Sequence, residues 1–107
     1  MTMDAAVMDR DLEEARALLD GVQLAGAPLS VDRCRHASVT LTALWVFRQE
    51  PGRAREQIGN INRDAEPGER TIDQAHWTAT QMHHSQPTGR KGCRTLSEAC
   101  AYVLTRR

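Results

Sequence analysis

The first hydrophobic pattern along the chain lies between Asp4 and Val22 and repeats with the period of an α-helix. Its apolar residues alternate spacings of four and three, at Met8, Leu12, Ala15, Leu19 and Val22. Such spacing puts them on one face of a helix. Acidic residues gather in the first half, where the helix dipole favours negative charge, and Gly21 marks the end. The segment therefore predicts an amphipathic helix.

A second apolar segment follows a loop at residues 23–29 and predicts a helix that begins after the capping residue Ser30. One face of this helix would consist of Cys34, Ala37, Leu41, Leu44 and Trp45. We expect Pro51 and Gly52 to end it, because proline lacks the amide hydrogen that a further turn requires. The helix would supply the centre of the core and bury Trp45.

The same segment also fits a β-strand over residues 38–47. The run from Val39 to Thr42 is rich in β-branched residues and alternates apolar with polar side chains, which is typical of a half-buried strand. In that alternative, Trp45 and Phe47 share a face and the fold becomes α+β. The polar residues that follow, Arg48–Glu50, favour the helix.

The second half of the chain predicts two further helices, each opened by a capping box, in which two side chains accept hydrogen bonds from backbone amides. The boxes are Thr71–Gln74 and Thr95–Glu98. The helix after the first box would run to about Ser85, with a stripe of Ile72, Ala75, Ala79 and Met82. The last helix would bury Leu96, Ala99, Cys100, Val103 and Leu104. The polar region before these helices holds at most a short helix over Arg53–Ile58.

Together these segments predict an all-α fold, a compact bundle of four main helices with one short additional helix, as a single helical domain over residues 1–107. A chain of this length buries about two thirds of its unfolded surface, which is enough for one modest core. Its composition, 40% hydrophobic and 26% charged residues, is that of a globular protein.

Charge changes this picture through its distribution. Lysine plus arginine equals aspartate plus glutamate, at 14 each, so no strong overall field attracts the chain to nucleic acid or to an anionic membrane. However, residues 1–20 carry six acidic and two basic side chains, whereas residues 88–107 carry five basic and one acidic. Either the two ends compensate each other or form solvated faces, or the basic end meets an acidic partner.

The cysteines and the apolar stretches indicate in which cellular compartment the protein is expected. Cys34, Cys93 and Cys100 are an odd number without the paired spacing of a zinc site. We find no apolar N-terminal signal region, and the longest apolar stretch is far shorter than the roughly 20 residues that cross a bilayer. We therefore expect a cytoplasmic protein of bacterial or phage origin without a membrane span.

Imidazole and thiolate side chains at His76, His83, His84 and Cys93 raise the question of a metal site. On a helix, two ligands of one ion lie three or four residues apart, whereas His76 and His83 are seven apart. The neighbouring His83 and His84 would point in different directions. The spacing predicts no metal and no cofactor, and only the fold can decide whether these side chains gather.

Catalytic motifs are missing from the sequence as well. The chain has neither Ser-x-x-Lys nor Gly-x-Ser-x-Gly, and the adjacent acids Glu13 and Glu14 belong to an exposed helix face. The turn at residues 89–92 departs from the pattern of a phosphate-binding loop. We therefore expect no catalytic residues and a protein that is not an enzyme.

Candidate binding residues remain at Trp77 and at Arg90, Lys91 and Arg94. Trp77 falls off the stripe of its expected helix, so an exposed ring could anchor a protein partner or a second copy of the chain. The three basic residues occupy an expected loop. We predict a non-enzymatic interaction or regulatory module, an inhibitor or adaptor, that occludes or bridges a protein partner through these residues. The alternatives are a nucleic-acid-binding regulator that uses the basic loop and last helix, and a helical protein that binds a small ligand or a metal.

Overall fold

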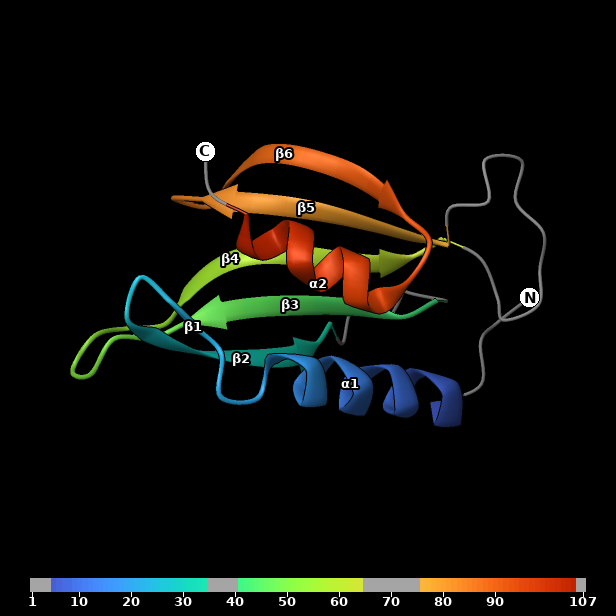
Figure 1. Cartoon of the computed structure of the whole chain (residues 1–107), viewed down its shortest axis with the longest axis horizontal. Coiled ribbons are helices and arrows are strands. Elements are labelled where there is room, and N and C mark those ends of the chain that lie inside the picture. Colours follow the sequence, from blue (N-terminus) through green and yellow to red (C-terminus); the bar gives the residue numbers. More distant parts are fainter. Residues whose placement is uncertain (1–4, 35–40, 65–75, 106–107) are drawn as a thin grey trace.

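The computed structural model describes residues 5–34, 41–64 and 76–105, which form two helices and a six-stranded sheet (Figure 1). Helix α1, Ala5–Leu19, opens this part of the chain, and helix α2, Leu96–Leu104, closes it. The strands between them are β1 Gln23–Leu24, β2 Ala27–Arg33, β3 Ala43–Arg48, β4 Glu56–Arg63, β5 Trp77–His83 and β6 Gln86–Cys93.

The sheet is an antiparallel meander in which each strand pairs with the next one along the chain. Both helices pack on one side of it: α1 contacts β2 and α2, and α2 contacts β4, β5 and β6. Figure 1 shows the curled sheet with α2 across its middle strands and α1 alongside β2. No helix in the described part of the chain covers the other face.

The strand register divides the side chains between these two faces. One row across the open face consists of Asp32, Trp45, Asn60, Thr80 and Arg90, each opposite the next on the neighbouring strand. The adjacent row, on the side of the helices, consists of Val31, Val46, Gly59, Gln81 and Gly89. Because side chains alternate between faces along a strand, the helix side collects the apolar positions.

The core lies between the helices and the sheet. Its buried side chains are Ala15, Leu19, Val31, Leu44, Val46, Ile58, Ile61, Trp77, Ala79, Cys93, Leu96, Ala99, Cys100 and Val103. Both helices contribute the faces that their periodicity predicts, and the Thr95 side chain accepts a hydrogen bond from the amide of Glu98, as expected for a capped α2. The two helices at the ends of the chain are therefore confirmed.

The all-α helical bundle, however, is wrong. Wherever the structure describes these residues, the helices predicted after Ser30 and over Arg53–Ile58 are replaced by the end of strand β2, strand β3, the start of strand β4 and the irregular segments between them, and the end of the third predicted helix is β5. The first capping box, Thr71–Gln74, lies outside the described residues. The strand alternative for residues 38–47 holds for β3, whose residues Trp45 and Phe47 share a face.

The turn between β5 and β6 gives no sequence signal of a hairpin. The β5–β6 turn places His84 and Ser85 at φ values of 49° and 64°, and the β1–β2 turn uses Ala25 and Gly26 at 51° and 78°. Two positive φ angles in a two-residue turn match the twist of a β-hairpin, but the usual sequence signal is Asn-Gly or Asp-Gly. Because His-Ser lacks that signal, the segment could pass for the end of a helix.

Candidate functional site

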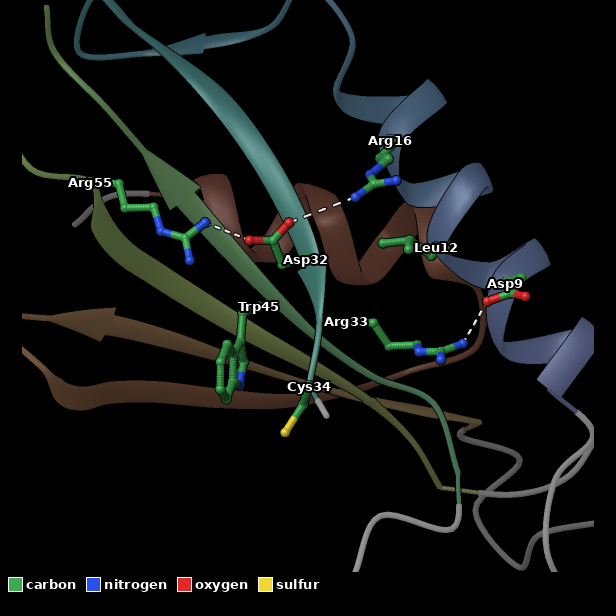
Figure 2. A pocket seen from close by; sticks show the side chains of 8 residues that line it. All are labelled: Asp9, Leu12, Arg16, Asp32, Arg33, Cys34, Trp45 and Arg55. Atoms are coloured by element: carbon green, nitrogen blue, oxygen red, sulfur yellow. Dashed lines mark hydrogen bonds and ion pairs between the residues drawn. The ribbon is translucent and has the colours of Figure 1, made fainter. Parts of the chain in front are cut away.

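A pocket of about 600 Å³ lies where helix α1 passes the end of β2 (Figure 2). The lining residues are Asp9, Leu12, Arg16, Asp32, Arg33, Cys34, Trp45 and Arg55. The first three come from one face of α1, and the others come from the end of β2, from β3 and from the residue before β4. The pocket thus combines three guanidinium groups, two carboxylates and an indole ring.

Asp32 is the centre of the charge network in this pocket. Its Oδ1 lies 3.6 Å from Nη2 of Arg16, and its Oδ2 accepts a hydrogen bond from Nη1 of Arg55. Figure 2 shows its carboxylate between the two guanidinium groups, while Arg33 pairs with Asp9 on α1. All these side chains are partly exposed, and ion pairs of this kind contribute little to stability. Their main effect is to orient charged groups around the cavity.

Two of the arginines are held in place by further contacts. Nε of Arg16 donates a hydrogen bond of 3.1 Å to the backbone carbonyl of Val31. Cζ of Arg55 lies 3.9 Å from the centre of the Phe47 ring, which meets the Trp45 ring edge-on. Phe47 is buried, whereas Trp45 is 38% exposed, so the accessible part of this aromatic pair is the indole. The pocket therefore presents oriented guanidinium groups beside an exposed aromatic ring.

The free edge of β6 is the second candidate surface, because three of the predicted binding residues lie along it. Arg90 and Lys91 are exposed on β6, and Arg94 is exposed between β6 and α2. β5 pairs with one side of β6, and no described strand pairs with the other side. The basic residues thus belong to a strand edge and a short connection, not to the long loop that the sequence suggests.

The hydrogen-bond pattern shows which backbone groups of β6 point outward. The amide of Asp64 donates to the carbonyl of His76 at 2.8 Å, so the even-numbered residues at the start of β5 bond to β4 and the odd-numbered ones to β6. Because Trp77, Ala79 and Gln81 of β5 stand opposite residues 93, 91 and 89 of β6, the backbone groups of these three β6 residues form hydrogen bonds with β5. The N–H and C=O groups of Arg90 and Gly92 therefore face the free edge.

The neighbouring basic side chains of β6 lie on opposite faces of the sheet. Arg90 stands opposite Thr80 on the open face, and Lys91 lies on the helix side, with Nζ 3.5 Å from Oε1 of Glu98. The backbone amide of Arg94 and the ammonium of Lys91 lower the pKa of Glu98. Three basic groups against one acidic group leave this edge positively charged.

Trp77, the fourth predicted binding residue, lies in the core. Its ring is 4% exposed, and the guanidinium Cζ of Arg63 lies 4.3 Å from the ring centre. On the sheet, Trp77 stands opposite the buried Cys93. This placement favours a structural role, and it separates Trp77 from the three basic residues with which the sequence analysis grouped it.

The thiols and imidazoles form no cluster of three in the described part of the chain, although the backbone amide of His76 donates a hydrogen bond of 3.0 Å to the carbonyl of Cys93. The rings of His83 and His84 lie with their centres 3.9 Å apart at the β5–β6 turn, tilted by 54° to each other, whereas His76 precedes the other end of β5. No three His, Cys, Asp or Glu side chains of the described residues are arranged to hold a metal ion. Burial raises the pKa of Cys93, and it raises that of Cys100 to about 11, so both thiols are protonated near neutral pH.

Sequence reasoning missed the pocket altogether. Leu12 was assigned to the apolar stripe of the first helix, and Asp9 and Arg16 were not connected with it, although spacings of three and four residues put all three on one helix face. Asp32 and Trp45 are neighbours only through the register of β2 and β3. Recognising the strand alternative for residues 38–47 would have placed Trp45 on one face of a sheet, without naming its neighbours.

Neither described helix has the length and the apolar character needed to cross a membrane. Comparison of the chain with known protein families, with characterised proteins and with solved structures found no match.

Proposed function

We propose that this protein is a non-enzymatic interaction module that binds an extended, acidic segment of a partner protein along the free edge of β6. The observation that carries the proposal is the combination of outward-facing backbone groups at Arg90 and Gly92 with exposed basic side chains at Arg90, Lys91 and Arg94. An extended peptide that adds to a sheet edge gains affinity from its backbone and specificity from its side chains.

The geometry also defines the partner segment. Arg90 and Lys91 are adjacent, so their side chains lie on opposite faces, and residues of an added strand alternate in the same way. An acidic residue opposite Arg90 and another opposite Lys91 would therefore be consecutive in the partner sequence. The preferred ligand is a short extended segment with two adjacent acidic residues, flanked by residues of high β-propensity.

The other edge of the sheet is less suited to strand addition. β1 already pairs with Ala27 and Pro28 at one end of β2. Further along β2, the carbonyl of Val31, which points away from β3, already accepts a hydrogen bond from Arg16. Two copies of β6 would bring their basic clusters together, which disfavours a dimer through this edge. Phosphate binding is supported less, because Arg90 and Lys91 lie on opposite faces and Glu98 partly neutralises Lys91.

A blocked hexapeptide of sequence Thr-Val-Asp-Glu-Val-Thr, titrated into isotopically labelled protein, tests this proposal by NMR. We expect amide shifts along β6 and on α2 near Glu98. Arg90→Glu should weaken binding by about tenfold or more, because a repulsive contact replaces an attractive one. Arg53→Glu is the matched control, since Arg53 is an exposed arginine in the β3–β4 connection.

Two companion peptides separate the contributions of charge and backbone. A Lys-Lys version should not bind, and a version with N-methyl groups on the paired amides should lose most of its affinity. Shifts confined to residues outside β6, or equal binding by all three peptides, would overturn the proposal. Binding of a single-stranded oligonucleotide with the same loss in Arg90→Glu, but no binding of the acidic peptide, would assign the edge to nucleic acid instead.

A further inference from the structure

The pocket beside α1 lies at the opposite edge of the sheet from β6, and its charges do not balance. Arg16, Arg33 and Arg55 supply three positive charges, and Asp9 and Asp32 supply two negative charges. Because Asp32 is shared between Arg16 and Arg55, one guanidinium charge lacks a carboxylate of its own among the residues that the structure describes. An anion with a single charge would complete this arrangement.

Unused hydrogen-bond donors point to the same kind of ligand. Each guanidinium group carries five N–H donors. Within the described residues, Arg55 uses Nη1 for Asp32, which leaves its Nε and Nη2 without a hydrogen-bond acceptor. Arg16 uses Nε for the carbonyl of Val31 and Nη2 for its ion pair with Asp32, so that Nη1 remains as a donor for a ligand. A planar carboxylate matches such donors in pairs, since arginine binds carboxylates through two parallel hydrogen bonds.

The rest of the pocket is suited to an apolar body attached to that carboxylate. Leu12 and the exposed indole of Trp45 line the cavity beside the arginines. A volume of about 600 Å³ lies within the range of small-molecule sites, which are mainly apolar with a few oriented polar groups. Aromatic rings bind well against an indole because offset and edge-on contacts are both favourable.

From these observations we infer that the pocket binds a small aromatic carboxylate. The carboxylate lies between Arg16 and Arg55, where it competes with the carboxylate of Asp32, and the aromatic ring packs against Trp45 and Leu12. The Phe47 ring beneath Arg55 and the Val31 carbonyl beside Arg16 hold both guanidinium groups in place before the ligand arrives. This site is independent of the β6 edge, and neither proposal depends on the other.

Naphthalene-2-carboxylate and its neutral amide are the probes for a direct test, because they share size and shape and differ in charge. Binding is followed by NMR shifts of the protein amides. We expect the acid to bind about tenfold more tightly than the amide, which corresponds to one charge-assisted arginine contact. Arg55→Met should reduce the affinity for the acid to that for the amide, and Trp45→Ala should weaken both.

The most informative variant is Asp32→Asn. If Asp32 competes with the ligand for Arg16 and Arg55, the neutral side chain frees both donors, and the acid should bind several-fold more tightly. A role of Asp32 that is only structural predicts no gain. Arg53→Met is the control for loss of an exposed arginine outside the pocket. Thermal unfolding of every variant shows whether the fold is kept, which we expect because the substituted side chains are partly exposed.

Several outcomes would overturn the inference. Equal affinity for acid and amide would show a nonspecific apolar contact, and unchanged or weaker binding in Asp32→Asn would remove the competition between Asp32 and the ligand. Shifts along β6 instead of around the pocket would also contradict it. The same spectra record whether the acidic hexapeptide reaches β6, so a failure of this inference is distinct from a failure of the proposed function.

Discussion

Cys100 illustrates, at the residue scale, how surroundings change the chemistry of a side chain. It lies on the face of α2 that packs against the sheet and is 4% exposed. Desolvation is the main reason for its raised pKa of about 11, and the nearby carboxylate of Glu14 adds to the effect. An ordinary cysteine has a pKa of 9.0 on the same scale. The thiol therefore stays protonated near neutral pH and packs as a small apolar side chain.

This shift predicts a loss of stability in alkaline solution. Above pH 9.0 the unfolded chain releases the Cys100 proton while the folded protein keeps it, so the free energy of unfolding falls until pH reaches about 11. Between pH 9 and pH 10.5 the loss should be about 1.5 kcal/mol. Urea unfolding at a series of pH values measures it. Cys100→Ala should remove most of this dependence, and Cys34→Ala should retain it; equal slopes in all three proteins would contradict the assignment.

At the scale of the elements, the position of α2 depends on small residues in the strands beneath it. Gly59 and Gly89 lie in the row of the sheet that faces α2, on either side of Gln81. The Nε2 of Gln81 donates to the carbonyls of Tyr102 and Thr105, at 2.8 and 2.5 Å. The helix can approach this closely because no Cβ stands between its backbone and β4. The sheet therefore determines how deeply α2 is seated.

Two alanine substitutions at these glycines should have different effects. A Cβ at Gly59 would lie 2.4 Å from Cγ1 of Val103 and 3.0 Å from the carbonyl of Thr80, and neither can move easily. We expect Gly59→Ala to cost about 2–3 kcal/mol of unfolding free energy through overpacking. At Gly89 the closest atom is the hydroxyl of Tyr102, at 2.6 Å, on a side chain that can shift. Gly89→Ala should cost less than about 1 kcal/mol.

Thermal or urea unfolding of both variants makes this comparison. The double variant Gly59→Ala/Val103→Ala supplies the mechanism, because removal of the methyl groups that the new Cβ meets should make its cost smaller than the sum of the single costs. Equal destabilisation by Gly59→Ala and Gly89→Ala would show that loss of glycine, not the contact with Val103, is responsible.

At the scale of the whole molecule, a buried charge network joins α1 to the sheet. Asp11 of α1 is 1% exposed and accepts hydrogen bonds from Nε and Nη2 of Arg63 on β4, at 3.0 and 2.8 Å. Thr42, before β3, donates to the same carboxylate at 2.7 Å. Arg63 in turn covers the ring of Trp77 on β5. A single acidic side chain on the first helix thus orders side chains from three strand regions.

Removal of both members of the Asp11–Arg63 pair should destabilise the protein by less than the sum of the two single removals. Asp11→Leu leaves the Arg63 guanidinium buried without its carboxylate, and we expect a loss of about 3–5 kcal/mol of unfolding free energy. Arg63→Met should cost a similar amount. The double variant should lie well below the sum of the single losses, because no uncompensated charge remains. Strictly additive losses, measured in urea, would show that the pair does not act as a unit.

The sequence by itself determined the two helices at its ends, since a helix forms its hydrogen bonds within four residues and its stripe, its dipole and its cap are all local. The exposed basic residues Arg90, Lys91 and Arg94 were also visible in this way, although not as part of a strand edge. The burial of Asp11 could not be predicted in this way, because the local sequence of a helix does not indicate whether solvent or an arginine lies beside an acidic side chain.

Only the tertiary structure decided the rest. Strand hydrogen bonds join residues that are distant in the sequence, so the register that places Asp32 beside Trp45 leaves no local trace. The same is true of the turn at His84 and Ser85, whose positive φ angles come from the hairpin rather than from glycine. The candidate pocket exists because the sheet brings α1, β2 and β3 together. The pocket depends on pairing between residues that are distant in the sequence, and no local sequence pattern indicates that pairing.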